Sequence, residues 1–158
     1  MIKNEGTDEF RIEWHDPREL PNEVRGFIYN LYRILVELHP AINRLRFAFI
    51  ISMKDAPEQT QHADNESIVL YKYDNVRVPI EQIPFSMIFD VEHCVDNKSY
   101  LRVKNKLVLI PPGGYILFRG DCRHSGVAYN KQNIRLFVGV GTTVFPWDPD
   151  KVILYRDV

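Results

Sequence analysis

The sequence predicts a mainly β domain in which one amphipathic helix precedes a run of short antiparallel strands. Apolar residues recur with three-four spacing only between residues 24 and 38, and from residue 45 onward the pattern changes to alternation. Turn residues separate the strand-like segments, and no helical segments alternate with them. This order argues against a parallel Rossmann-type sheet and favours an antiparallel sandwich or jelly roll.

Length and composition are those of one compact domain spanning residues 1–158, with a polar stretch at 1–9 that we expect to be flexible. The chain has 158 residues, of which 45% are hydrophobic and 26% charged, so it can bury a substantial core. Its formal net charge of −1 argues against a nucleic-acid partner bound through a broad basic face. Two cysteines and an N-terminus without an apolar run predict reduced thiols, no membrane segment and, by default, a cytoplasmic location. The oligomeric state is left open.

The first predicted elements are a strand and the helix. Residues 10–14 alternate between apolar and charged side chains, as a half-buried strand does. Asn22 is predicted to cap the helix, which should end at His39 because a residue before proline avoids the α conformation. We expect its apolar stripe to pack against a sheet; the stripe comprises Val24, Phe27, Ile28, Leu31, Ile34, Leu35 and Leu38.

The remaining elements are predicted strands. From Leu45 to Met53 the odd-numbered side chains are apolar and share one face, whereas Arg46, Ala48, Ile50 and Ser52 share the other. Gly-rich or Asn-rich turns then separate further strands, which we expect at Ser67–Tyr73, Phe85–Val91, Tyr100–Val103, Lys106–Ile110, Tyr115–Phe118, Ile134–Gly141 and Val152–Tyr155.

Two histidines and an aspartate are candidate metal ligands. His62 and Asp64 form a His-x-Asp element, and alternate residues of a strand point to the same side. His124, which we expect on a tight loop, follows Asp64 by 60 residues (124 − 64), so only a rolled antiparallel sheet brings the two together. Two histidines and one carboxylate with open positions form the facial arrangement of non-haem Fe(II) oxygenases.

Arg135 is a candidate for binding an anionic co-substrate beside the metal. It lies eleven residues after His124 (135 − 124) in a strand whose neighbouring residues are apolar. Three protein ligands leave three positions on an octahedral ion, and a 2-oxo acid can occupy two of them. The far carboxylate of such a compound would be buried, where a bidentate arginine pair offsets the cost of its charge.

These residues resemble the C-terminal half of the Fe(II)/2-oxoglutarate-dependent dioxygenases, and in particular the phytanoyl-CoA-hydroxylase-like group. The resemblance covers roughly residues 45–145 and rests on His62 and Asp64 together with the ordered set Gly114, His124, Asn130 and Arg135. It implies a double-stranded β-helix, or jelly roll. It also implies Fe(II) bound by His62, Asp64 and His124, with 2-oxoglutarate and O2 as co-substrates and Arg135 on the far carboxylate of 2-oxoglutarate. The implied reaction hydroxylates a small molecule or a protein side chain.

The sequence departs from the family pattern at one position. Phe137 stands where the family often has a serine or threonine that helps to hold 2-oxoglutarate, so Tyr71 or Tyr73 is predicted to supply a hydroxyl instead. The segment between Asp64 and His124 also leaves little room for a substrate lid. Both features favour an alternative, a catalytically inactive jelly-roll binding module that retains the fold.

Two further interpretations stay open at this point. A cupin-like metal protein is disfavoured, because no His-x-His cluster is followed by a glutamate at the usual spacing and Arg135 would have no role. The polar stretch around His62, residues 57–65, is also compatible with a simple surface turn.

Overall fold

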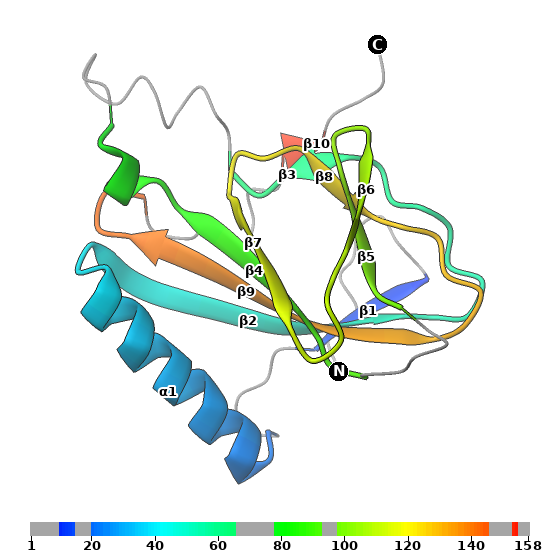
Figure 1. Ribbon diagram of the computed structural model, residues 1–158, viewed down its shortest axis with the longest axis horizontal. Coiled ribbons are helices and arrows are strands. Elements are labelled where there is room, and N and C mark those ends of the chain that lie inside the picture. The colour runs from blue at the N-terminus through cyan, green and yellow to red at the C-terminus, as the bar shows by residue number, and fades with distance from the viewer. Residues whose placement is uncertain (1–9, 15–19, 66–77, 93–97, 146–152, 155–158) are drawn as a thin grey trace.

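The described strands form two five-stranded antiparallel sheets that face each other (Figure 1). The computed structural model describes residues 10–14, 20–65, 78–92 and 98–145, together with the backbone of residues 153–154. One sheet has the order β1-β2-β9-β4-β7, and its strands are Arg11–Trp14, Ile42–Ser52, Asn133–Thr142, Phe85–Asp90 and Tyr115–Arg119. The other has the order β10-β3-β8-β5-β6, and its strands are Ile153–Leu154, His62–Ala63, His124–Gly126, Tyr100–Val103 and Lys106–Leu109.

This architecture confirms the predicted mainly β jelly roll with one packed helix. Most predicted strands are present within one to three residues of the expected limits, although β2 begins already at Ile42. The prediction of a loop at His124 is wrong, because His124 begins the short strand β8, which pairs with both β3 and β5. The predicted strand Ser67–Tyr73 lies outside the described residues.

Helix α1 spans Asn22–Leu38 and covers the outer face of the β2-β9-β4 sheet (Figure 1). The prediction that Asn22 caps the helix is wrong, since Pro21 occupies the N-cap position and Asn22 is the first helical residue. The ring of Pro21 fixes its φ at an extended value, and the side chain of Asn22 accepts a hydrogen bond from Arg25 instead of capping the backbone. The helix ends at Leu38, one residue before the predicted end at His39, which occupies the C-cap position ahead of Pro40.

The face of α1 that packs on the sheet only partly matches the predicted stripe, which contains Leu31 and Leu35 but not Tyr32 or Val36. Its buried contacts are made by four side chains, Leu31, Tyr32, Leu35 and Val36, which pack against Ile42, Met87, Leu136, Val138 and Val140. Phe27, Ile34 and Leu38 belong to the predicted stripe but are 44%, 54% and 77% exposed. The prediction that the helix packs against a sheet is therefore confirmed, with these three residues at or beyond the margin of the contact. No helix among the described residues is long and apolar enough to cross a membrane.

A second apolar cluster lies in the interior between the two sheets, and this interior is called the barrel below. Ile88, Leu101 and Ile110 are its buried centre, and Phe137 packs against them. Alternation along β9 sends Leu136, Val138 and Val140 to the helix side. The alternate residues of β9, among them Arg135 and Phe137, therefore face the interior between the sheets.

Replacing Gly26 with alanine is expected to stabilise the fold. Gly26 lies on an exposed side of α1, and a Cβ added there meets no atom within 4 Å. Alanine restricts the unfolded chain and favours the helix, so the free energy of unfolding should rise by about 0.5–1 kcal/mol. Chemical denaturation followed by circular dichroism measures the change, and a loss of stability would contradict the open environment of Gly26.

Candidate metal centre

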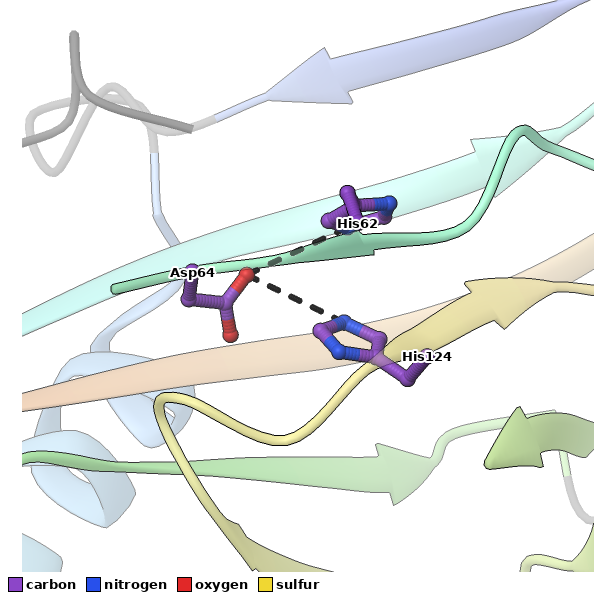
Figure 2. A group of neighbouring side chains, drawn as sticks. All are labelled: His62, Asp64 and His124. Atoms are coloured by element: carbon purple, nitrogen blue, oxygen red, sulfur yellow. Dashed lines mark ion pairs between the residues drawn. The ribbon is translucent and has the colours of Figure 1, made fainter. Parts of the chain in front are cut away.

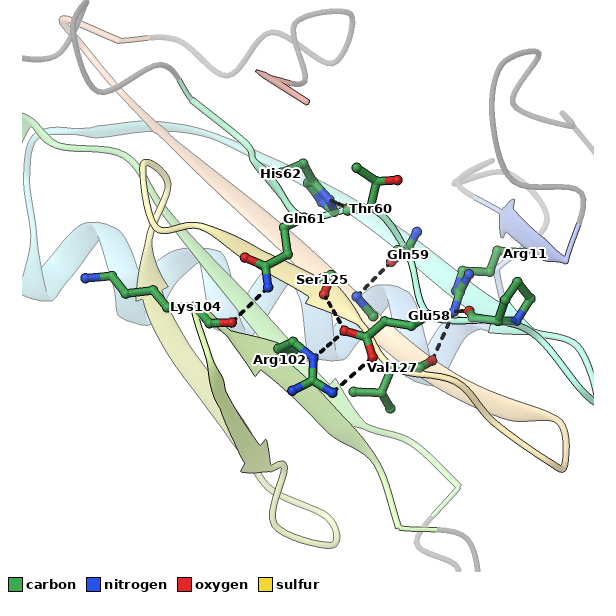
Figure 3. A network of polar contacts seen from close by, with 12 residues as sticks. Arg11, Glu58, Gln59, Thr60, Gln61, His62, Arg102, Lys104, Ser125 and Val127 are labelled. Carbon is green, nitrogen blue, oxygen red and sulfur yellow. Dashed lines mark hydrogen bonds and ion pairs between the residues drawn. The ribbon is translucent and has the colours of Figure 1, made fainter. Parts of the chain in front are cut away.

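The segment that carries His62 is bound along the second sheet. The backbone N–H of Gln59 donates to the carbonyl of Gly126, and the Gln59 side chain accepts from the Gly126 N–H, both at 2.9 Å. Gln61 donates through Nε2 to the carbonyl of Lys104 at 2.9 Å (Figure 3). The interpretation of residues 57–65 as a simple surface turn is therefore wrong, because its polar side chains extend the hydrogen bonding of β8 and β5.

Charged side chains hold the same segment in place. Arg102 on β5 pairs with Glu58 through both Nε and Nη2, the latter at 3.0 Å from Oε2 (Figure 3). Arg11 on β1 donates to the carbonyls of Pro57 and Val127, at 2.5 and 3.0 Å. Side chains from β1 of one sheet and β5 of the other therefore hold in place the chain segment that leads to His62.

The side chains of His62, Asp64 and His124 converge on one point (Figure 2). His62 on β3 lies directly opposite His124 on β8 in the antiparallel pair. One potential ligand atom from each of the three residues lies within 4.8 Å of the others, and this is the only such group of three found among the described residues. The Nε2 atoms of His62 and His124 lie 3.9 and 3.8 Å from Oδ1 of Asp64.

Each histidine is oriented by a backbone carbonyl. Nδ1 of His62 lies 3.2 Å from the carbonyl oxygen of Thr60, and Nδ1 of His124 lies 2.9 Å from that of Cys122. Because a carbonyl only accepts, these contacts assign the N–H to Nδ1 and leave the lone pair on Nε2. Both lone pairs therefore belong to the nitrogens that face Asp64, the usual arrangement for metal-ligating histidine.

Asp64 is held from the opposite sheet. Oγ of Ser86, on β4, donates to Oδ2 of Asp64 at 2.5 Å. Asp64 is 7% exposed and Ser86 is fully buried. One carboxylate oxygen is therefore bound by the wall of the barrel, while the other faces the two imidazoles.

The electrostatics of the cluster favour the form of histidine that binds metals. Burial, followed by the neighbouring His124, lowers the pKa of His62, and the Asp64 carboxylate opposes this effect. A neutral imidazole is the form that binds metals, so this shift favours His62 as a ligand. Burial also raises the pKa of the nearby Cys122 thiol, which disfavours the thiolate that would compete as a ligand.

The donor set fits a divalent first-row metal ion. Two imidazole nitrogens and one carboxylate oxygen, all within reach of one ion, are the facial triad of non-haem iron sites. The carboxylate of Asp64 is buried beside the two imidazoles, and a bound cation is one way to compensate a buried acidic group. The role of the three residues as ligands stays a prediction, but the fold brings them together as that role requires.

Arg135 faces the same interior but lies farther along the barrel. On β4, Ser86 is opposite Gly139 and Asp90 is opposite Arg135. Four residues therefore separate the level of Ser86 from that of Arg135, which is about 13 Å along the strand. Arg135 is 1% exposed; its Nη2 donates to Oγ of Ser52 at 2.7 Å, and its guanidinium lies 5.2 Å from the centre of the Tyr129 ring.

Several residues around the candidate site could not be identified from the sequence. Ser86, on β4, and Tyr129, at an isolated bridge to Ala56, carried no pattern, because a hydroxyl alone says nothing about its partner. Beside Arg135, a buried chain of hydrogen bonds runs from Asn133 to Ser99 at 3.0 Å and from Ser99 to Asp90 at 2.6 Å. The only sequence signal for these polar residues is their position beside apolar neighbours. Tyr71 and Tyr73, predicted to supply a hydroxyl to the co-substrate, lie outside the described residues.

Replacing Gly120 with alanine is expected to disturb this centre. An added Cβ would lie 2.4 Å from Nδ2 of Asn65 and 3.2 Å from the carbonyl oxygen of Pro84. Asn65 follows Asp64 directly, and its N–H donates to the Gly120 carbonyl at 2.8 Å. Overpacking of this kind costs about 1–3 kcal/mol, so the free energy of unfolding should fall by that amount. Gly26→Ala in open space is the matched control, and equal effects of the two substitutions would refute the prediction.

Known proteins match this chain through structure alone. No protein-family model matches the sequence, and no curated protein matches it. Among solved structures, a prolyl 4-hydroxylase of Pseudomonas putida aligns with a TM-score of 0.57 and 10% identity, over 84% of this chain and 71% of the other. A prolyl 4-hydroxylase of Phytophthora capsici aligns with a TM-score of 0.57 and 11% identity, over 84% and 48% of the two chains.

A third structure is a prolyl hydroxylase from Trichoplax adhaerens in complex with a peptide fragment of the oxygen degradation domain of hypoxia inducible factor. It aligns with a TM-score of 0.57 and 13% identity, over 87% of this chain and 66% of the other. The chain has the fold of the prolyl hydroxylases. It spans from about half to about seven tenths of the length of these three proteins.

Proposed function

We propose that this protein is an Fe(II)- and 2-oxoglutarate-dependent dioxygenase that hydroxylates a small molecule or a protein side chain. One observation carries the proposal: His62, Asp64 and His124 converge inside a barrel whose interior also holds the buried Arg135. A cation-binding group and a buried arginine within one interior are what a metal ion and a small dicarboxylate together require.

In this proposal the three candidate ligands, Arg135 and the surrounding apolar cluster have separate roles. The Nε2 atoms of His62 and His124 and Oδ1 of Asp64 hold the iron. Iron bound with 2-oxoglutarate and O2 supplies the oxidising chemistry, in which 2-oxoglutarate becomes succinate and CO2 while the substrate gains a hydroxyl group. Arg135 neutralises the far carboxylate of 2-oxoglutarate and orients it, and the apolar cluster around Ile88 and Phe137 limits the access of water.

A protein side chain is the substrate class that the comparisons favour. The three similar structures are prolyl hydroxylases, and the one from Trichoplax adhaerens holds a peptide. Because the shared property is the fold, the substrate of this chain is to be found by testing peptides and small molecules side by side.

An anaerobic titration of 2-oxoglutarate into the Fe(II)-loaded protein tests the proposal without a known substrate. Chelation of iron by the 2-oxo acid should produce a visible metal-to-ligand charge-transfer band that saturates with added 2-oxoglutarate. Succinate, which lacks the 2-oxo group, is the matched control and should produce no band. Folded, iron-loaded protein without a band would refute the proposal.

A non-catalytic binding module on the same fold is the second candidate. Phe137 favours it, because this residue packs into the interior cluster where a hydroxyl would have helped to hold 2-oxoglutarate. Asp90, opposite Arg135 on the same inward face, also favours it, since an acid there competes with a bound carboxylate. Iron binding without the band would support this candidate.

A further inference from the structure

The two carboxylate oxygens of Asp64 have different surroundings. Oδ1 faces the Nε2 atoms of His62 and His124, at 3.9 and 3.8 Å. Oδ2 points away from them and accepts the hydroxyl hydrogen of Ser86, with the two oxygens 2.5 Å apart. One oxygen of the carboxylate therefore faces the candidate metal centre, and the other is hydrogen-bonded to strand β4.

We propose that Ser86 is a positioning residue that fixes Asp64 as a monodentate ligand through Oδ1. This inference rests on the proposed role of His62, Asp64 and His124 in binding a metal ion, and it deepens that role. Ser86 does not contact the metal; it acts through Asp64 by occupying Oδ2 and by setting the rotation of the carboxylate.

Control of the carboxylate is chemically necessary at such a site. Carboxylates can ligate through one oxygen or through both. If the site held a six-coordinate ion, two histidines and one oxygen of Asp64 would leave three positions, all of which a chelating 2-oxo acid and O2 would need. Binding through both oxygens of Asp64 would take one of them. The hydrogen bond from Ser86 engages one lone pair of that second oxygen and fixes the rotation of the carboxylate, which disfavours binding through both oxygens.

The fold gives Ser86 the rigidity that this task needs. Ser86 is fully buried in β4, between the neighbouring strands β7 and β9, where it pairs with Phe118 and Gly139. Its cross-strand neighbour Gly139 has no side chain that competes for the hydroxyl. The hydrogen bond also links the two sheets, because Asp64 follows β3 of the second sheet directly.

Ser99 provides a matched control within the same chain. It is 1% exposed, and its Oγ donates to Oδ1 of a buried aspartate, Asp90, at 2.6 Å. Ser86→Ala and Ser99→Ala therefore each remove a buried hydroxyl that donates to a buried aspartate, and Ser99→Ala also removes the acceptor of a hydrogen bond from Asn133. Only the first pair includes one of the three candidate ligands.

The test is a titration with Co(II) alone, followed through its visible absorption bands in the wild type, Ser86→Ala and Ser99→Ala. Ser86→Ala should bind Co(II) about 10–100-fold more weakly, as is typical when the partner of a metal ligand is removed. Its bands should also change in shape and intensity, because the released carboxylate can alter the coordination. Ser99→Ala should match the wild type in affinity and bands, and urea denaturation shows how far each variant is destabilised.

Conservative variants separate positioning from folding. Ser86→Thr keeps the hydroxyl and should restore the affinity and the bands of the wild type, whereas Ser86→Val, which has the same shape without a hydroxyl, should not. Wild-type affinity and bands in Ser86→Ala or Ser86→Val would overturn the inference and leave the metal centre standing. An equal loss in Ser99→Ala would also overturn it. A wild-type protein that binds no Co(II) would overturn the proposed metal centre itself.

Discussion

Replacing His124 with alanine is expected to weaken Fe(II) binding by more than about 100-fold. Loss of the partner of a metal ligand typically costs 10–100-fold in affinity, so loss of the ligand itself should exceed this range. His124 is 3% exposed, and its ring is fixed by the Cys122 carbonyl on one side and by Phe118, at 4.7 Å between ring centres, on another.

The measurement is an anaerobic competition titration of Fe(II) against a chelator, with circular dichroism to verify the fold. His39→Ala is the matched control, because His39 is a histidine at the end of α1 and lies outside the cluster of three. We expect His39→Ala to bind Fe(II) like the wild type. Undiminished affinity in His124→Ala would mean that the cluster does not bind the metal.

The position of His124 shows which part of the site could be predicted from the sequence. The ligand types and their order were visible, because His-x-Asp and a distant histidine require no knowledge of the fold. The strand β8 was not visible, since its three residues, His-Ser-Gly, lack both alternation and β-branched side chains. It exists because β3 and β5 flank it and supply its backbone hydrogen bonds.

The fold class could be predicted from the spacing of apolar residues and from the order of helix and strands. The contacts between side chains of the two sheets could not be predicted in this way. The alternation along β2 correctly placed Ala48 and Ser52 on one face and Phe47 on the other. That Ser86 would meet Asp64, 22 residues away, depends on how the two sheets are stacked. A hydroxyl in a strand has no preferred partner, so its role became clear only when the partner atom was located.

Replacing Arg135 with leucine is expected to weaken 2-oxoglutarate binding by at least about 30-fold while Fe(II) binding persists. Removing one partner of a buried, hydrogen-bonded charge pair costs about 2–5 kcal/mol, because the other charge is left in a poorly solvated place. Arg135 is 1% exposed in β9, so a carboxylate that reaches it has lost most of its water. Leucine fills much of the buried volume without a charge, and circular dichroism verifies that the variant folds.

The Arg135→Lys variant tests whether a positive charge alone is enough to bind 2-oxoglutarate. Lysine keeps the positive charge but loses the planar fork that binds a carboxylate at two points, so its affinity for 2-oxoglutarate should lie between those of the wild type and the leucine variant. Arg25→Lys is the control, because Arg25 is an exposed arginine on α1 whose Nη2 donates to Asn22. The charge-transfer titration measures all three variants. Undiminished 2-oxoglutarate affinity in Arg135→Leu would assign the arginine to a structural pair, with Asp90, opposite Arg135 on β4, as the nearest candidate.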